Sequence, residues 1–474
     1  MGTVKGFDVG GGSGAAMIRV FHHYFSSRKL ALFLAETVAI GLACLASAVF
    51  FAFVVARSHG PTAGLNLAIP KLAVLSLGFV CTFQFALYLL DLYDLRVAGE
   101  DRGRGLRALK AVGVAVVAIG AVTALSPLQL PGGSLLGGAM GAVAGTFLVR
   151  AGIPSVVGEP ARVLIVGRGA EARWLAQTIE AQGENALTVC ALADPPSAGA
   201  SAGVRDDLDR LAKEHGAKFV VSAVDEAPGA SCAESLLQCR LAGFQVLDAV
   251  GFCERVLRRI PVAYLRTLDL ALSDEISVSR FRRLVKRCFD LAMAAVFMIG
   301  AAPLMLITAI VIKLDSPGPV LYRQERVGRD GKGFVLWKFR SMAADAEKDG
   351  PAWAKIGDDR ATRVGRFIRK TRIDEIPQVI NVLLGEMSFV GPRPERPVFV
   401  KQLKAVVPFY GLRETAQPGI TGWAQIRYPY GASIEDARNK LEFDLYYVKH
   451  GSLFLDIAIM FHTIRHVLRL RGAR

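Results

Sequence analysis

The sequence predicts a membrane protein with an α-helical N-terminal bundle of spans, an α/β module, and a second α/β domain that carries a re-entrant membrane helix. Hydrophobic residues make up 52% of the 474 residues, and the mean hydropathy of +0.37 is too apolar for an ordinary soluble chain. Apolar strand-like runs alternate with helical patterns over 160–250. Residues 280–474 hold 33 Lys and Arg against 19 Asp and Glu, so this basic part should meet nucleic acid, acidic lipid or phosphorylated substrates.

The first 150 residues predict a flexible N-terminus and four membrane spans. Residues 1–29 start with a Gly-rich tract and lack the apolar core and cleavage site of a signal peptide. The four-helix transmembrane region, 30–150, contains apolar segments at 30–56, 72–90, 111–125 and 135–149. The first two reach the ~20 residues that a crossing needs, whereas the last two are shorter and rich in Gly and Ala. A buried helical bundle of a soluble protein is the alternative.

Loop charges predict the orientation of these spans. Basic residues precede the first segment and cluster at 96–110 between the second and third segments. The loop between the third and fourth segments carries no charge. Because positively charged loops stay in the cytoplasm, we expect a multi-pass protein whose later domains are cytoplasmic.

The stretch "RVLIVGRGAEARWLAQTIEA" (162–181) reads as a strand, a glycine turn and a helix. Gly167, Gly169 and Ala172 form the G-x-G-x-x-A turn of a dinucleotide-binding fold. Together with the alternating elements that follow, it predicts a Rossmann-like (CoA-binding-like) module over 160–250 and a linker over 251–284. The turn could serve a ligand, or only the packing of strand against helix.

Residues 285–313 form an apolar segment with basic residues at both ends, and Pro303 lies near its middle. Proline removes a helix hydrogen bond and kinks the chain. A full crossing would place the most basic domain outside the cell, against the loop-charge rule. We therefore predict a re-entrant helix that breaks at Pro303, with a fifth full span as the alternative.

Residues 314–474 combine short motifs with Pro/Gly-rich loops. "GPVLYRQERVGRDGKGFVLWKFRSM" (318–342) predicts a hairpin around "GRDGKG" that presents Lys338 and Arg340. A basic helix should precede the acid pair Asp374–Glu375. The last helix, 452–472, is apolar at helical spacing with a cationic end, which suits either an interfacial or a core-facing helix.

Two interpretations fit the acid pair in "KTRIDEIPQ" (370–378). Acids favour a helix N-terminus, by ~0.3–1 kcal/mol, and Thr371 could cap that helix. Alternatively, carboxylates inside a basic shell suit phosphoryl transfer, in which Arg and Lys bind phosphate oxygens. The acids would then hold a divalent metal or attack phosphorus. Since Mg²⁺ prefers oxygen ligands, no cluster of His or Cys is needed.

The motifs "KFRSM", "RVGRFIRKTRIDEIPQVINVLLGEMSFVGPRP" and "PGITGWAQI" resemble the bacterial polyprenyl-phosphate sugar-1-phosphate transferases, also called monotopic phosphoglycosyl transferases. The resemblance is specific over about 280–474, and the whole layout resembles the long polytopic subclass. Two positions depart from the family: Ala302 stands where Ser is frequent, and "GDDR" (357–360) replaces "NDPR". Neither touches the acid pair.

The resemblance implies an activity, a catalytic domain over 314–474 and a bacterial inner (cytoplasmic) membrane location. A nucleotide-diphosphate sugar, typically a UDP-sugar, would give its sugar-1-phosphate to undecaprenyl phosphate and release a nucleoside monophosphate, which initiates polysaccharide biosynthesis. Asp374 would be the nucleophile of a covalent phospho-sugar intermediate, and Glu375 would help to bind Mg²⁺. The resemblance further implies phosphate or substrate binding by a basic set and one downstream acid: Lys338, Arg340, Arg369, Arg393 and Asp444. The expected partners are the donor sugar, the lipid phosphate and the bilayer, with a homodimer left open.

Three rival functions fit the sequence less well. A nucleotide-sugar dehydrogenase or epimerase would need an acid about 20 residues beyond the glycines, but Asp194 lies farther along and precedes two prolines. A transporter or membrane sensor would need more polar groups in the spans than Glu36 and Gln84. A nucleic-acid partner is not expected, because the basic residues alternate with acids and apolar runs.

The seven cysteines contain no C-x-x-C pair. This argues against a zinc site and a disulfide framework. It suits a reducing compartment.

Overall fold

The computed structural model describes residues 17–20, 23–59, 78, 80–87, 113, 140–149, 161–181, 187–195, 207–224, 230–267, 280–342, 360–429, 431 and 433–468. The chain divides into two compact units, 1–249 and 250–474. Each unit is described by itself below.

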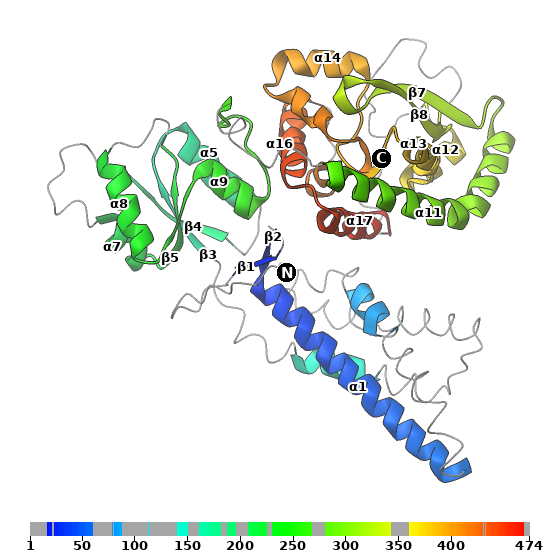
Figure 1. Ribbon diagram of the computed structural model, residues 1–474, viewed down its shortest axis with the longest axis horizontal. Helices are drawn as coiled ribbons and strands as arrows, with labels where there is room; N and C mark the ends of the chain where they lie inside the picture. The colour runs from blue at the N-terminus through cyan, green and yellow to red at the C-terminus, as the bar shows by residue number, and fades with distance from the viewer. Residues whose placement is uncertain are drawn as a thin grey trace. The chain divides into compact units, whose positions relative to one another are not determined.

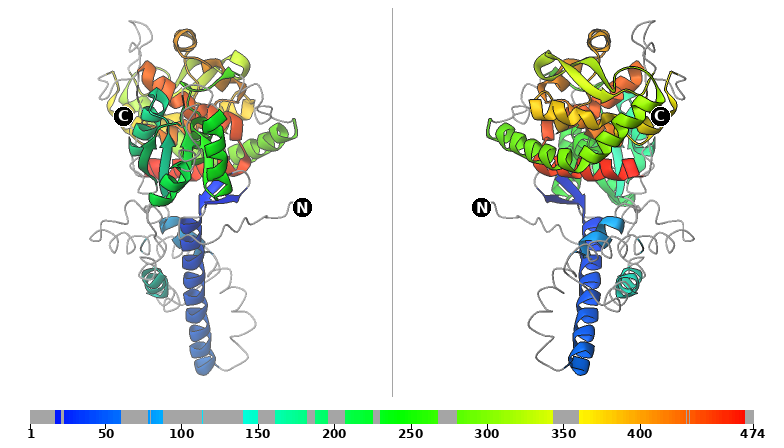
Figure 2. Two further views of the ribbon diagram at one scale, coloured as in Figure 1. Left: turned by 90° about the vertical axis from the view of Figure 1, so that its left-hand side faces the viewer. Right: turned by 90° about the vertical axis from the view of Figure 1, so that its right-hand side faces the viewer.

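The first predicted span, 30–56, lies inside one long helix, α1 (Ser27–His59). Its 33 residues extend over about 50 Å at 1.5 Å per residue, which exceeds the ~30 Å of a bilayer core. Figure 2 shows α1 as one straight helix. Two short antiparallel strands, β1 (Met17–Val20) and β2 (His23–Ser26), precede it within the segment that the sequence predicts to be flexible.

A short apolar helix, Met140–Val149, packs closely on α1. A Cβ at Gly141 would lie 2.6 Å from Ala43 Cβ, and one at Gly145 would lie 3.3 Å from Ala39 Cβ. Small residues four apart therefore let the two helix backbones approach, as in membrane helix pairs. Residues 78 and 80–87 of the second predicted span are helical, and all of the third span except residue 113 lies outside the described residues.

The predicted Rossmann-like pattern is present as a four-stranded parallel sheet in the order β4-β3-β5-β6. The strands are β3 (Ala161–Val166), β4 (Leu187–Ala193), β5 (Ala217–Ser222) and β6 (Gln245–Asp248). The helices between and after them are α5 (Ala170–Ala181), α7 (Asp207–Glu214), α8 (Ala230–Leu241) and α9 (Ala249–Phe252). Figure 1 shows α7 and α8 on one side of the sheet and α5 on the other.

The glycine turn after β3 has a packing role. Gly167 has φ +133°, and a Cβ there would lie 2.1 Å from the carbonyl oxygen of Ala223. The Gly167 N–H donates to Ala193 O, and the Ala223 N–H donates to Val166 O. Asp194, the acid considered for a ribose, instead pairs with Arg168 at 2.9 Å. These hydrogen bonds join the end of β3 to the ends of β4 and β5, so close packing of the strands explains the glycine turn.

The predicted membrane segment 285–313 lies inside α11 (Arg280–Asp315), one helix that continues through Pro303 without the predicted break. By length and composition, α11 is long and apolar enough to cross a membrane. Figure 1 shows that the ribbon of α11 changes direction along its length. A bend is expected at a proline, because its missing N–H leaves one carbonyl without its helical partner.

Both ends of α11 pack on the unit formed by 250–474. Near its start, Arg287 donates to Val382 O and Leu383 O, and Asp290 Oδ1 accepts from Ser388 Oγ at 3.0 Å. Near its end, Ile312 joins a small core cluster with Phe339 and Ile368. Between these ends its large apolar side chains are mostly exposed, among them Val296, Ile299, Leu306 and Ile307. A straight helix of 36 residues would be about 54 Å long, so attachment at both ends fits a bent helix.

The rest of this unit is mainly helical, with two small sheets among the described residues. The label η marks a short helix that is not an α-helix: η3 is a π-helix, and η5, η6 and η7 are 3-10 helices. In chain order the unit holds η3 (Cys253–Leu257), β7 (Leu321–Val327), η5 (Arg329–Gly331), β8 (Gly333–Phe339), α12 (Arg363–Lys370), η6 (Ile373–Gln378), α13 (Val379–Leu384), β9 (Ser388–Val390), α14 (Pro397–Val406), η7 (Tyr410–Thr415), β10 (Gly419–Thr421), α15 (Trp423–Arg427), α16 (Ile434–His450) and α17 (Leu453–Leu468). The predicted hairpin is confirmed, since β7 and β8 pair antiparallel. The only other sheet in this described part is the parallel pair β9–β10. The described part of this domain therefore contains less sheet than the predicted α/β class implies.

The core of this unit includes part of the predicted linker. Ile260 and Val262 are buried with Val379, Trp423 and Leu441. The Ile260 N–H donates to Glu442 O at 3.0 Å. The chain that follows the Rossmann-like module is therefore an integral part of this domain's core.

The last helix, α17, packs one face on the core and leaves another face exposed. Leu455 and Ile459 are buried, whereas Phe461 and Ile464 are 44% exposed. The core-facing interpretation accounts for the first face. The interfacial interpretation remains a proposal for the second.

Candidate active site

A tight turn places the two acids. Thr362 caps the start of helix α12, its side chain accepting from the Gly365 N–H, and Thr371 is the C-cap residue after Lys370. Arg372 then has φ 60°, a left-handed conformation that reverses the chain into η6. Thr371 does not cap the following helix as expected, because its hydroxyl donates back to Phe367 O. The acid pair occupies the first turn of η6, so the helix-start interpretation is correct about the local structure.

Three cationic side chains contact the carboxylate of Glu375. Its Oε1 lies 2.7 Å from Arg393 Nη2, 3.2 Å from Arg372 Nη1 and 3.4 Å from Lys338 Nζ. The cations come from strand β8, the turn before η6 and the loop after β9. Burial alone would raise the pKa of Glu375, but the three cations outweigh it and hold that pKa well below the ordinary value. Glu375 is therefore ionised at neutral pH.

Asp374 has a different environment. It is 7% exposed, and its Oδ1 has no hydrogen-bond partner among the described residues. Burial and then the negative charge of Glu375 raise the pKa of Asp374 to about 6, against the opposing effect of Lys338 and the arginines. With a pKa of about 6, Asp374 is still mostly ionised at neutral pH, and Lys338 and the arginines favour that form. The cations contact Glu375, which leaves Asp374 more basic and more nucleophilic than an ordinary aspartate.

Two of the predicted phosphate-binding residues, Lys338 and Arg393, lie beside the acid pair. Burial lowers the pKa of Lys338, and the charge of Glu375 opposes this. The Asn381 side chain bonds to one edge of the β8 backbone here: its Oδ1 accepts from Trp337 N at 3.1 Å, and its Nδ2 donates to Val335 O at 2.7 Å. The strand that carries Lys338 is thereby fixed against the helix that follows the acids.

The other three predicted residues lie elsewhere. Arg340 is 6% exposed and donates to Ser316 O and Pro317 O, so it attaches the end of β8 to the segment after α11. Arg369 is half-buried on α12, and its side chain has no hydrogen bond or ion pair among the described residues. Asp444 is 2% exposed on α16 and bonds to Arg413.

Sequence reasoning missed two site residues. Arg372 stood in the quoted basic cluster but was not assigned a role, although it contacts Glu375 directly. Arg413 lies outside every quoted motif, and no pattern in the sequence signals it. It contacts the main chain of Arg393.

Asp374 also fits a magnesium ion. No group of three or more His, Cys, Asp and Glu side chains suited to a metal occurs within the described parts of the chain. Mg²⁺ in phosphate-binding sites is held by one or two carboxylates together with substrate phosphates, so a larger cluster is not required. The buried Oδ1 of Asp374 that lacks a partner is the suitable ligand. Glu375 is a weaker candidate, because cations already surround its Oε1.

Comparison with known proteins matches residues 281–470 to the family model "Bacterial sugar transferase". The UDP-N-acetylgalactosamine-undecaprenyl-phosphate N-acetylgalactosaminephosphotransferase of Aeromonas hydrophila is 44% identical over 239 residues, which are 50% of this chain and 56% of that protein. The undecaprenyl-phosphate glucose phosphotransferase of Komagataeibacter xylinus is 34% identical over 338 residues, 69% of this chain and 63% of that protein. The chain thus spans about three fifths of the length of these two relatives.

A third relative is covered more fully. The UDP-glucose:undecaprenyl-phosphate glucose-1-phosphate transferase of Caulobacter vibrioides is 43% identical over 192 residues, which are 71% of its length. The chain belongs to the bacterial sugar transferase family. The matched segment of this family member begins one residue into α11 and contains every residue of the site.

Proposed function

We propose that this protein transfers a sugar-1-phosphate from a UDP-sugar to undecaprenyl phosphate and thereby initiates polysaccharide synthesis. One observation carries the proposal: a buried aspartate with an oxygen that lacks a hydrogen-bond partner lies next to a glutamate that gathers three cations. The names of the relatives describe such transfers of glucose-1-phosphate and of N-acetylgalactosamine phosphate. They support a UDP-hexose donor.

In the first step, a carboxylate oxygen of Asp374 attacks the donor phosphorus that carries the sugar. The bond from this phosphorus to the bridging oxygen breaks, and the oxygen leaves with its electrons as part of UMP. Arg393, Arg372 and Lys338 neutralise the phosphate oxygens as their charge shifts, an electrostatic stabilisation that contributes several kcal/mol in comparable sites. The product on the enzyme is an acyl phosphate, in which Asp374 carries the sugar-1-phosphate.

In the second step, an oxygen of the lipid phosphate attacks the same phosphorus. The bond to Asp374 breaks, and its carboxylate is restored. The raised pKa of Asp374 makes it a better nucleophile for the first step, whereas acylphosphates remain good enough leaving groups for the second. Both steps therefore use one carboxylate, and Glu375 keeps the cations in position throughout.

The Asp374 carboxylate has two oxygens, so one can hold Mg²⁺ while the other forms the bond to phosphorus. When bound, the metal supplies positive charge that polarises the diphosphate oxygens. Glu375 would then act mainly through Arg393, Arg372 and Lys338.

We further propose that α11 dips into the cytoplasmic leaflet and returns, which places the site at the surface of the bilayer. The support is that both ends of α11 pack on the same unit while its middle exposes large apolar side chains. An acceptor whose phosphate lies at the membrane surface could reach the site without leaving the bilayer.

The direct test uses purified full-length protein in nanodiscs that contain undecaprenyl phosphate, with Mg²⁺ and either UDP-glucose or UDP-N-acetylgalactosamine. We expect release of UMP together with a lipid-linked sugar diphosphate from one of the donors. The proposal fails if no UDP-sugar in an extended panel yields UMP.

A further inference from the structure

Arg413, on η7, is a buried arginine with no assigned role. Its Nε and Nη2 lie 3.0 Å and 2.8 Å from Asp444 Oδ2, and its Nη1 donates to Tyr410 OH at 2.9 Å. Its Nη2 also donates to the main-chain carbonyl of Arg393 at 2.8 Å. It is 9% exposed, and all three guanidinium nitrogens bond to protein groups.

The Arg393 carbonyl belongs to a segment whose geometry sets the site. Arg393 lies between Pro392 and Pro394, so its backbone has restricted freedom and the segment has few N–H groups with which to anchor itself. Carbonyls anchor it instead: Pro392 O accepts from Gly419 N, Pro394 O accepts from Arg326 Nη1, and Arg393 O accepts from Arg413.

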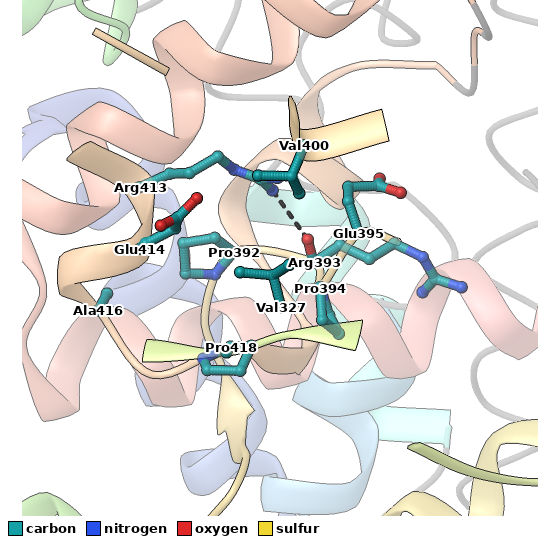
Figure 3. A pocket seen from close by; sticks show the side chains of 11 residues that line it. Val327, Pro392, Arg393, Pro394, Glu395, Val400, Arg413, Glu414, Ala416 and Pro418 are labelled. Carbon is teal, nitrogen blue, oxygen red and sulfur yellow. Dashed lines mark hydrogen bonds between the residues drawn. The ribbon is translucent and has the colours of Figure 1, made fainter. Parts of the chain in front are cut away.

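Figure 3 shows the guanidinium of Arg413 pointing at the Arg393 carbonyl, while the Arg393 side chain extends away from Arg413. On that other side, Arg393 Nη2 lies 2.7 Å from Glu375 Oε1. A continuous set of contacts therefore leads from Asp444 on α16 through Arg413 and Arg393 to the acid pair.

We propose that Arg413 and Asp444 form a positioning pair that fixes the phosphate-binding Arg393 from behind. This role rests on the proposed transfer reaction, to which it adds two residues that position Arg393. The family resemblance suggested Asp444 as a substrate contact. In this proposal Asp444 acts indirectly, through Arg413. Neither side chain touches the substrate in this account.

The competing view is that the pair only stabilises the fold, as many buried ion pairs do. Loss of one partner would then lower stability and leave the Arg393 side chain where it is. The two views differ in one respect. Only a positioning role makes the loss of kcat/KM on changing Arg413 depend on whether Arg393 is present.

Arg413→Lys is the informative variant, because lysine keeps the charge but its single ammonium lacks the planar fork that holds Asp444 and the Arg393 carbonyl together. We expect kcat/KM for the UDP-sugar to fall about 10- to 100-fold, mostly through kcat, since small misplacements of a phosphate-binding group have effects of this size. In an Arg393→Lys background, the same change should cost less than about 3-fold, because coupled residues are not additive.

Arg259→Lys is the matched control. Arg259 also pairs with a buried acid on α16, as its Nη2 lies 2.7 Å from Glu442 Oε2, and the other oxygen of that acid accepts from Val262 N, outside the Arg393 segment. We expect this variant to lower the unfolding temperature and to change kcat/KM by the same small factor in both backgrounds.

Hydrogen exchange of the full-length protein supplies a readout that needs no turnover. Arg413→Lys should speed exchange at the amides near Arg393, and Arg259→Lys should not. Equal losses of kcat/KM in both backgrounds, or unchanged exchange near Arg393, would overturn the inference. If the wild-type protein turns over no UDP-sugar, the proposed function fails, and the exchange measurement still decides whether Arg413 fixes the segment.

Discussion

Replacing Glu375 by Gln removes the negative charge that three cations share while keeping the size of the side chain. Glu375 is 8% exposed, with Arg393, Arg372 and Lys338 between 2.7 and 3.4 Å from its Oε1. Removing one partner from a buried charge pair typically costs about 3–5 kcal/mol, because the remaining charge is left uncompensated. For a domain of this size, about 1 kcal/mol corresponds to 2–4 °C in Tm, so Tm should fall by about 6 °C or more at pH 7.5.

The pH dependence of this loss has a definite sign. Despite burial, the cations hold the pKa of Glu375 well below its ordinary value of 4.5. Its contribution to stability is therefore fully present above the unfolded pKa and is lost as the pH falls through the folded one. The difference in Tm between wild type and Glu375→Gln should be constant above about pH 7, because Asp374, whose pKa of about 6 depends on the charge of Glu375, is ionised there in both proteins. The part of the difference that comes from Glu375 itself should be lost only below about pH 4.5.

Thermal unfolding, followed by tryptophan fluorescence of the full-length protein in nanodiscs, would measure this. Glu325→Gln is the control: it changes an exposed glutamate on β7 with no ion pair among the described residues, and its effect should stay within about 0.5 kcal/mol. A Glu375→Gln protein that unfolds within 2 °C of wild type at pH 7.5, in line with a change of under about 1 kcal/mol, would refute the three-cation arrangement.

Three further predictions follow from particular residues. Because burial and the charge of Glu375 raise the pKa of Asp374 to about 6, and the nucleophile must be ionised, kcat/KM should fall about tenfold per unit as the pH drops below 6, and a profile flat down to pH 5 would contradict this. Gly167→Ala should destabilise the Rossmann-like module by about 3 kcal/mol or more, because φ is positive there and a Cβ would lie 2.1 Å from Ala223 O. The abundance of the protein should fall, with little change in activity per folded molecule. Gly243→Ala, with φ +96° but no atom within 4 Å, should cost less, and a loss of activity in folded Gly167→Ala protein would instead indicate a ligand at the turn. Cysteines introduced near residues 270 and 350 in a cysteine-free background should be labelled from the cytoplasmic side only, and labelling from opposite sides would exclude a re-entrant α11.

The elements that the sequence predicted best are those set by local chemistry. The β7–β8 hairpin follows from a glycine-rich turn between alternating strands, and its register pairs Val327 with Gly333 as the motif implies. The parallel strands of the module follow from apolar runs separated by helical patterns. In both cases the signal lies within a few consecutive residues.

The roles of individual charges were harder to predict, because they depend on which distant groups meet. Arg340 lies two residues after Lys338, so the sequence treats the two alike. Strand β8 ends at Phe339, however, and Arg340 turns to Ser316 while Lys338 reaches Glu375. Spacing along a chain carries no information about such divergence.

The acid pair shows the same limit at closer range. The sequence placed Asp374 and Glu375 inside a basic shell, and the structure confirms that shell. Which acid the cations contact depends on the folded geometry: groups from three parts of the chain meet Glu375 Oε1, whereas Asp374 Oδ1 has no hydrogen-bond partner among the described residues. No composition or periodicity distinguishes the two side chains.

The central claim is that Asp374 forms a covalent bond to the sugar phosphate. The most direct measurement is mass spectrometry of the protein after incubation with UDP-sugar and Mg²⁺ but without undecaprenyl phosphate. We predict that the peptide containing Asp374 gains the mass of a sugar phosphate, that one equivalent of UMP is released, and that added undecaprenyl phosphate removes the adduct. Asp374→Asn should show neither adduct nor turnover while remaining folded. Turnover by Asp374→Asn, or turnover by the wild type in which UMP appears only when the acceptor lipid is present and no adduct forms, would contradict the account.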